Sequence, residues 1–201
     1  NGTRCVADFL SKENNNKEII LWTSSGSLKS KILGSNLVET EIGIPKTNWN
    51  EIPLSKDLDT KNLNIKILDK NNSEFIGGTA INVGNPHIVF FVKNVKDYDL
   101  KKIGPQIENH EYFPEKCNLT LAKIINKNLI KVNVWERGAG LTKACGTAAC
   151  ATAVAGNING LTDKKTDIEF SLGKLSILID ENNSVHMRGP VSDIKNIEIK
   201  I

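Results

Sequence analysis

The sequence lacks the features that mark several large classes of protein. No apolar run approaches the ~18 residues that a membrane-spanning helix needs, and the chain does not open on a charged segment followed by an apolar one. Arginine is scarce, the lysines are scattered, and the formal net charge is only +3. A nucleic-acid-binding protein would gather its positive charges into a stripe. We therefore expect neither a membrane nor a nucleic-acid partner.

The spacing of the cysteines favours neither a zinc site nor a disulfide framework. They occupy positions 5, 117, 145 and 150 with no Cys-x-x-Cys pair, and the histidines at 87, 110 and 186 have no spacing typical of zinc ligands. A chain of 201 residues with 39% hydrophobic residues needs no disulfide staples. We expect reduced thiols in a cytoplasmic protein, with no metal.

Short alternating runs separated by Asn, Gly, Asp and Pro predict many strands. The expected strands are Ile19–Trp22, Leu28–Leu33, Leu37–Ile42, Leu63–Leu68, Phe75–Val83, Ile88–Val92, Leu119–Ile125, Leu129–Arg137, Asp167–Ser171, Lys174–Ile179, Ser184–Arg188 and Ile194–Ile201.

Three segments are typical of helices instead. Thr3–Leu10 would bury an apolar face of Cys5, Val6, Phe9 and Leu10, and Leu100–Asn109 would restart at its Gly-Pro pair. The third, Gly146–Ala155, would end at a glycine in a left-handed cap, Gly156.

The third helix carries no charge at all, and a helix that is apolar all round must be buried on every side. Many strands and one buried helix suggest a sheet curled around that helix. A second helix near the start of the chain suggests that this unit occurs twice. We therefore predict an α+β fold, two-lobed in form.

Glu136 is a candidate functional carboxylate. Alternation along the preceding strand places Val132 and Val134 on its buried face, and Glu136 falls in the same phase. A carboxylate at the end of an inward-facing row needs a partner or a function. The glycine-containing segment Gly138–Gly140 that follows allows a sharp turn, and it could cover a site.

Cys145 stands where the Ala-rich helix begins. Helix N-terminal amides and the helix dipole stabilise a thiolate, which would lower the thiol pKa from its usual ~8.5. Gly146 and Thr147 offer free amide N–H groups that could bind a carboxylate. The alternative is that Cys145 is merely a small residue suited to a tight turn.

Two further segments have both a functional and a structural interpretation. Asn85 and His87 lie in a Gly-Asn-Pro-His sequence between two strands, which is also a common turn. Asn118 could bind the polar groups of a ligand, or it could simply end a loop.

Six segments occur together in a family-specific order: Asn-Gly-Thr-Arg-Cys-Val-Ala at 1–7, Gly-Asn-Pro-His at 84–87, Gly-Pro-Gln-Ile-Glu-Asn-His at 104–110, Glu-Arg-Gly-Ala-Gly at 136–140, Ala-Cys-Gly-Thr-Ala-Ala-Cys at 144–150 and Met-Arg-Gly-Pro at 187–190. With them the sequence resembles the diaminopimelate epimerases from its first residue to its last. The Glu-Arg-Gly and Ala-Cys-Gly-Thr segments are the most specific.

The resemblance implies two pseudo-symmetric lobes, each a curled, mainly antiparallel sheet around a central helix, with the site in the cleft between them. It implies an isomerase that needs no cofactor. One thiolate removes the α-proton of the amino acid, and a second thiol returns a proton on the opposite face. This inverts LL-diaminopimelate to the meso form for lysine and peptidoglycan synthesis.

The resemblance also assigns roles to single residues. Cys145 matches the second of the two catalytic cysteines, and Glu136 and His87 would tune or position the thiols. The substrate-contacting positions match Asn1, Asn85, Asn118, Glu136, Arg137, Gly146 and Thr147. Among these, Asn118 and Arg137 would bind the distal end of the substrate.

The sequence departs from the family pattern at its start. The first catalytic cysteine of the family lies two positions before the residue matched by Asn1, so we expect an N-terminally truncated fragment that is inactive as an epimerase on its own. Cys5 would lie about a helical turn from the cleft and pack in the core. We expect an incomplete first lobe at residues 1–45, completed by 191–201, and a second lobe at 46–190.

Two alternatives remain beside the epimerase hypothesis. One is a proline or hydroxyproline racemase of the same fold. The other is a non-catalytic binding or assembly module. The expected partner is a small-molecule substrate, and a homodimer is compatible with the sequence.

Overall fold

A computed structural model describes residues 2–23 and 26–192 of the chain. Most strands join one 11-stranded sheet, and β4 and β5 form a separate two-stranded sheet. The helices are α1 (Gly2–Asn14), the 3-10 helix η1 (Val95–Asp97), α2 (Leu100–Glu108) and α3 (Gly146–Ile158). The strands are β1 (Glu18–Thr23), β2 (Gly26–Gly34), β3 (Leu37–Gly43), β4 (Ile65–Leu68), β5 (Glu74–Gly77), β6 (Thr79–Asn82), β7 (Pro86–Phe91), β8 (Asn118–Asn126), β9 (Leu129–Glu136), β10 (Gly140–Thr142), β11 (Lys165–Phe170), β12 (Gly173–Ile179) and β13 (Val185–Pro190).

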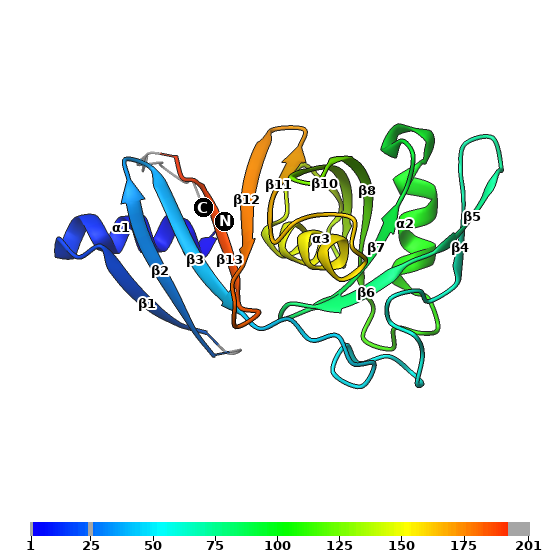
Figure 1. The fold of residues 1–201 in the computed structure, drawn as a ribbon, viewed down its shortest axis with the longest axis horizontal. Helices are drawn as coiled ribbons and strands as arrows, with labels where there is room; N and C mark the ends of the chain where they lie inside the picture. Colours follow the sequence, from blue (N-terminus) through cyan, green and yellow to red (C-terminus); the bar gives the residue numbers. More distant parts are fainter. Residues whose placement is uncertain (1, 24–25, 193–201) are drawn as a thin grey trace, which may run out of the picture.

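The large sheet curls around α3, as Figure 1 shows. Its strand order is β1-β2-β3-β13-β12-β11-β9-β8-β7-β6, with β10 paired to β9. Neighbours are antiparallel except β7 with β8 and β9 with β11, which are parallel. Parallel neighbours need a crossover connection, and here α2 and α3 lie in those crossovers. The predicted α+β fold with a curled sheet around an uncharged helix is confirmed.

Strands β6 and β7 and the first half of β8 are buried on both faces. Val89 of β7 packs in the core around α3, whereas its neighbours Ile88 and Phe90 pack in a second core that includes α2 and β4. Successive strand side chains point to opposite faces, so the apolar run 88–91 of β7 contributes to two cores at once.

Helix α1 packs against β1, β2 and β3 at the other end of the sheet (Figure 1). Its buried residues are Arg4, Ala7 and Asp8, whereas Val6 and Phe9 are 46% and 43% exposed. The predicted apolar contact face is therefore wrong at Val6 and Phe9, whereas Leu10 does pack against the core under α1. Residues three and four positions apart share a helix face, and the sheet takes the face that starts at Arg4. Cys5 is also exposed, contrary to the expected core position.

Three details differ from the expectations. The predicted strand Phe75–Val83 is divided into β5 and β6 at Gly78, whose φ is +104°. Helix α2 continues through Pro105 without a restart, because Pro105 removes only one hydrogen bond and the carbonyl it leaves belongs to an exposed residue, Lys101. Gly156 lies inside α3 and does not cap it; a Cβ there would lie 2.6 Å from the Thr162 hydroxyl, so this glycine allows close packing.

The expected lobe boundary near residue 45 stays a prediction. A small core of Ala7, Ile19, Val38 and Val191 lies under α1, and the Val191 amide donates to the carbonyl of Asn36 at 2.9 Å. The expected last strand, Ile194–Ile201, lies outside the described residues.

Candidate active site

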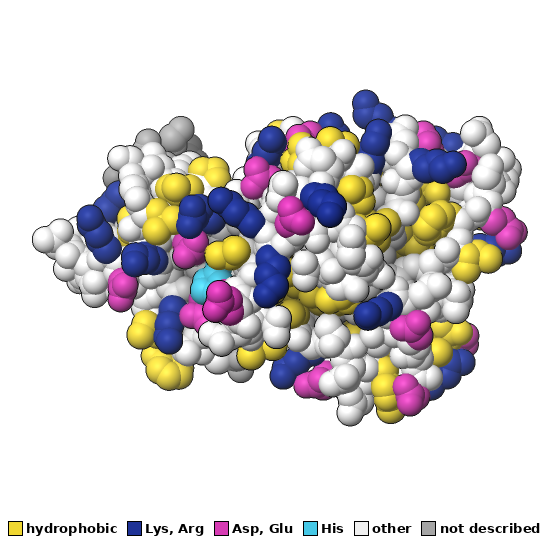
Figure 2. Space-filling model, in the orientation of Figure 1, with side chains coloured by type: hydrophobic (Ala, Val, Ile, Leu, Met, Phe, Trp, Pro, Cys, Tyr) yellow, Lys and Arg dark blue, Asp and Glu magenta, His cyan; other side chains and the backbone are white. Residues whose placement is uncertain are grey.

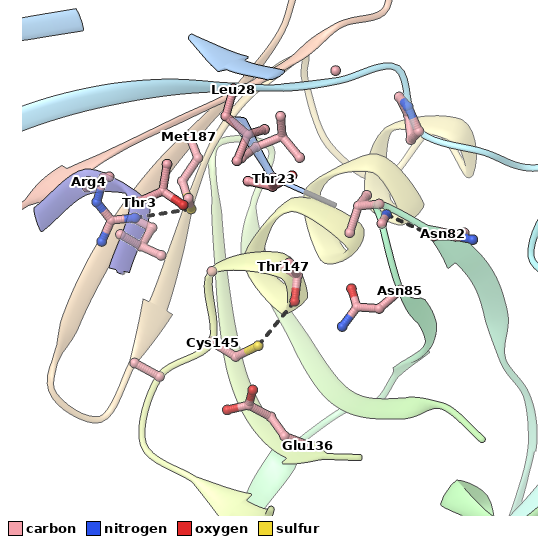
Figure 3. Close-up of a pocket in the computed structure, with 18 of the residues that line it drawn as sticks. Thr3, Arg4, Thr23, Leu28, Asn82, Asn85, Glu136, Cys145, Thr147 and Met187 are labelled. Carbon is pink, nitrogen blue, oxygen red and sulfur yellow. Dashed lines mark hydrogen bonds between the residues drawn. The ribbon is translucent and has the colours of Figure 1, made fainter. Parts of the chain in front are cut away.

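An open cleft of about 1230 Å³ lies between the α1 end of the sheet and the N-terminus of α3. Thr3, Arg4 and Leu28 border it on one side, and Cys145 and Thr147 border it on the other. Figure 3 shows these two groups facing each other across the cleft. The cleft is large enough for a small ligand with polar groups at both ends.

The Cys145 thiol, the Glu136 carboxylate and the Thr147 hydroxyl converge in this cleft (Figure 3). Cys145 is the N-cap residue of α3 and has extended backbone angles, so its side chain projects ahead of the helix. Its sulfur lies 3.4 Å from Thr147 Oγ1. Glu136 ends β9 in phase with the buried Val132 and Val134, which confirms the expected inward direction.

The environment of Cys145 raises the pKa of its thiol, which corrects the expected lowering. Burial contributes most because it disfavours the thiolate, and the hydrogen bond and negative charge of Glu136 raise the pKa further. Hydrogen bonds from Thr147 and from the Ala148 backbone act in the opposite direction and are outweighed. In the open cleft the group is therefore a thiol at neutral pH.

The first turn of α3 presents backbone amides beside this thiol. The first hydrogen bond of the helix is donated by the Ala149 amide to the Cys145 carbonyl, at 3.1 Å. The amides of Gly146 and Thr147 precede it and have no acceptor within the helix. Both residues line the cleft, so an anionic group can bind to them there.

Asn85 lines the cleft, and His87 lies behind it. His87 is completely buried, and its Nε2 lies 3.0 Å from Asn85 Oδ1. Burial, with a smaller contribution from the positive charge of Arg137, lowers the pKa of His87 to about 3. The imidazole is therefore neutral, and it contacts Asn85 rather than the cleft.

Asn118 and Arg137 are not among the described residues that line the cleft. Asn118 is buried, and its amide contacts two backbone groups: its Nδ2 donates to the Pro86 carbonyl at 2.9 Å, and its Oδ1 accepts from the Arg137 amide at 3.0 Å. The guanidinium of Arg137 donates to the Glu115 carbonyl at 2.6 Å. The structure therefore does not bring these two predicted substrate-binding side chains into the cleft.

The sequence analysis did not predict some of the residues that line the cleft, and one residue that it did predict lies outside the described part of the chain. Arg4 is 1% exposed, and its Nη1 donates to the sulfur of Met187 at 3.2 Å beside the cleft. Arg4 and Met187 both lie in segments that carry the family resemblance, so the sequence did contain a signal for them. Lys46 also lines the cleft, but nothing in the sequence marks it. Asn1 lies outside the described residues.

The described residues can also be searched for a charged surface, for a metal site and for a membrane-spanning helix. On the face shown in Figure 2, basic and acidic side chains are interspersed. In the described part of the chain, no group of three or more His, Cys, Asp or Glu side chains could hold a metal ion. No helix among residues 2–23 and 26–192 has the length and apolar character that crossing a membrane requires.

Comparison with known proteins decides the family. The family model described as "Diaminopimelate epimerase" matches residues 79–194. A diaminopimelate epimerase from Pelagibacter ubique is 75% identical over 201 residues, which is 100% of this chain and 73% of the relative. The chain belongs to the diaminopimelate epimerase family.

More distant members of this family also match nearly the whole chain. Diaminopimelate epimerases from Methylocella silvestris and Acidiphilium cryptum are 40% and 38% identical over 96% of this chain and 67% and 68% of their own lengths.

Solved structures share the fold at low sequence identity. A predicted epimerase from Pseudomonas aeruginosa has a TM-score of 0.64 at 14% identity, over 94% of this chain and 69% of the other. A hydroxyproline epimerase from Agrobacterium vitis has a TM-score of 0.62 at 11% identity, over 94% of this chain and 62% of the other.

Proposed function

We propose that the protein expressed from its complete coding sequence interconverts the LL and meso forms of diaminopimelate without a cofactor, and that Cys145 is one of the two acid–base groups. The observation that supports this most directly is the placement of the Cys145 thiol at the N-terminus of α3, next to Glu136 and inside the cleft. Together these groups offer a proton donor and an anion-binding helix terminus in one place.

The helix terminus would bind the α-carboxylate of the substrate through the amides of Gly146 and Thr147. When the α-proton is removed, negative charge develops on the α-carbon and spreads towards this carboxylate. Fixed amide dipoles stabilise that charge without having to reorganise. This accounts for deprotonation of a very weak carbon acid by the residues of the protein itself.

The Cys145 thiol would deliver a proton to one face of the α-carbon. Its S–H bond breaks as the new C–H bond forms, and the proton lost from the other face goes to the opposite base. In the reverse direction the Cys145 thiolate takes the α-proton. Glu136, which raises the thiol pKa, would keep the proton on sulfur until the substrate is bound.

Asn85 and Glu136 would contact the substrate, and the residues behind them would hold these two in place. His87 orients Asn85, and its neutral ring adds no competing charge. Asn118 joins the Pro86 and Arg137 backbones, so we propose that it positions both loops of the site from behind.

Solvent isotope exchange tests the proposal. The protein is expressed from its complete coding sequence, and formation of α-deuterated meso-diaminopimelate from LL-diaminopimelate is followed in D₂O. Cys145→Ala should lower the rate by on the order of 10²- to 10⁴-fold. Cys150→Ala is the matched control, because Cys150 lies in the same helix but is fully buried, and it should retain the activity. An unchanged rate in Cys145→Ala would overturn the role of this thiol.

A substrate panel separates the alternatives. The likeness to a hydroxyproline epimerase concerns the fold alone. Turnover of proline or hydroxyproline but not of diaminopimelate would favour the racemase. Stoichiometric binding without α-proton exchange would favour the non-catalytic module.

We further propose a cytoplasmic enzyme whose partner is the free amino acid, with no nucleic-acid or membrane partner. A homodimer remains compatible with this proposal. Size-exclusion chromatography with light scattering gives the oligomeric state directly.

A further inference from the structure

Glu108 is a buried carboxylate that takes no part in the proposed proton transfer. It is the last residue of α2 and is 8% exposed. No ion pair with Glu108 occurs among the described residues. The C-terminal end of a helix is also unfavourable for a negative charge. A carboxylate kept there needs strong hydrogen bonds.

Both oxygens of Glu108 accept hydrogen bonds from the segment that carries Glu136. Oε2 accepts from Trp135 Nε1 at 2.7 Å, and Oε1 accepts from the Gly138 amide at 3.0 Å. Trp135 and Gly138 lie immediately on either side of Glu136 and Arg137. One carboxylate therefore binds both the end of β9, just before Glu136, and the turn between β9 and β10 that follows it.

The packing around this contact makes it rigid. A Cβ at Gly104 would lie 2.3 Å from the Trp135 ring, so α2 packs directly on the indole. The end of α2 is fixed in turn by Cys117, whose amide donates to the Glu108 carbonyl at 3.3 Å and whose thiol donates to the Ile107 carbonyl at 3.4 Å. Glu108 thus has little freedom to move relative to the turn.

We propose that Glu108 is a positioning residue of the active site: it holds the β9–β10 turn so that the Glu136 carboxylate faces the sulfur of Cys145. Its catalytic consequence rests on the proposed function, whereas its effect on the Cys145 thiol does not. Glutamine keeps the size of the side chain but has a single acceptor oxygen for two donors. Glu108→Gln therefore breaks one of the two hydrogen bonds without opening a cavity.

The test compares Glu108→Gln with Glu111→Gln, an exposed control in the segment just after α2. The first readout is the pH dependence of Cys145 alkylation, followed by peptide mass mapping. In Glu108→Gln the displacement of Glu136 should shift the midpoint of Cys145 alkylation to lower pH. Glu136→Gln should shift this midpoint in the same direction. The second readout is epimerase kcat/KM, which should fall on the order of 10- to 100-fold, with Glu111→Gln unchanged in both.

A second variant covers the case in which Glu108→Gln fails to fold. Trp135→Phe removes only the indole donor, and it should shift the alkylation midpoint in the same direction by a smaller amount. If a folded Glu108→Gln variant has the alkylation profile and the kcat/KM of Glu111→Gln, and only its unfolding temperature changes, the positioning role is overturned. If the parent protein, expressed from its complete coding sequence, lacks epimerase activity, the proposed function fails, and the alkylation measurement still decides the role of Glu108.

Discussion

Helices α1 and α3 have the same length, 13 residues, and both pack against the large sheet, but they bury different kinds of side chain. The residues buried from α3 are small and uncharged, whereas α1 buries Arg4 and Asp8 and exposes Val6 and Phe9. A helix without a polar face can only be buried. A helix that has one apolar and one charged face can pack either face against the sheet. The residues of the sheet then determine which face is buried.

The sharpest test of this difference is the same charge placed in each helix. Ala151 in α3 is 0% exposed, so Ala151→Glu buries an unpaired carboxylate and should lower the free energy of unfolding by about 4 kcal/mol or more. Val6→Glu in α1 should change it by less than about 0.5 kcal/mol, because Val6 faces solvent. Urea denaturation measures both, and equal losses would show that the Val6 face is covered in the protein.

Titration of His87 should show that a charge at this buried position is not tolerated, whereas the buried Arg4 is accommodated. Burial lowers the pKa of His87 from 6.5 to about 3, so stability is intact above pH 6.5 and falls as the unfolded chain takes up the proton. Between pH 6.5 and about pH 5 the free energy of unfolding should drop by about 2 kcal/mol from this group. His87→Gln should flatten that dependence. His110→Gln should flatten it less, since His110 is only partly buried, and an equal effect would contradict the assignment to His87.

Glycine substitutions should separate the two helices by a smaller amount. A Cβ at Gly156 in α3 would lie 2.6 Å from the Thr162 hydroxyl, whereas nothing lies within 4 Å of one at Gly2 in α1. Gly156→Ala should cost on the order of 1 kcal/mol, as overpacking outweighs the gain in helix propensity. Gly2→Ala should leave the free energy of unfolding unchanged. In thermal unfolding, adding Thr162→Ala should restore the stability that Gly156→Ala loses. If the stability is not restored, the strain does not arise from contact with Thr162.

The smallest expected difference is in thiol reactivity. Cys5 in α1 is exposed, whereas burial raises the pKa of Cys145 at the start of α3 and raises that of Cys150 within it to about 12. Near pH 8, iodoacetamide should therefore modify Cys5 several-fold faster than Cys145, and Cys150 only on unfolding. Peptide mass mapping over time gives the three rates. Faster labelling of Cys145 would mean that the thiol is activated after all.

Local signals in the sequence were enough for much of the site. Strand alternation placed Glu136 inward, and the uncharged helix predicted both the curled sheet and the position of Cys145 at a helix terminus. The direction of the Cys145 pKa could not be found in this way, because it depends on burial and on Glu136, nine positions earlier in the chain. The functions of the Asn118 amide also depend on the backbone groups of Pro86 and Arg137, which are distant from it in the chain.

The sequence alone determined the family, the fold class and the uncharged helix, because these follow from composition, period and ordered motifs along the chain. Only the tertiary structure decided which face of α1 is buried, that Asn118 and His87 lie behind the cleft, and that Glu108 holds the turn carrying Glu136. These depend on contacts between residues far apart in the chain, such as the 2.7 Å hydrogen bond from Trp135 to Glu108. Local patterns carry no information about which distant groups will meet.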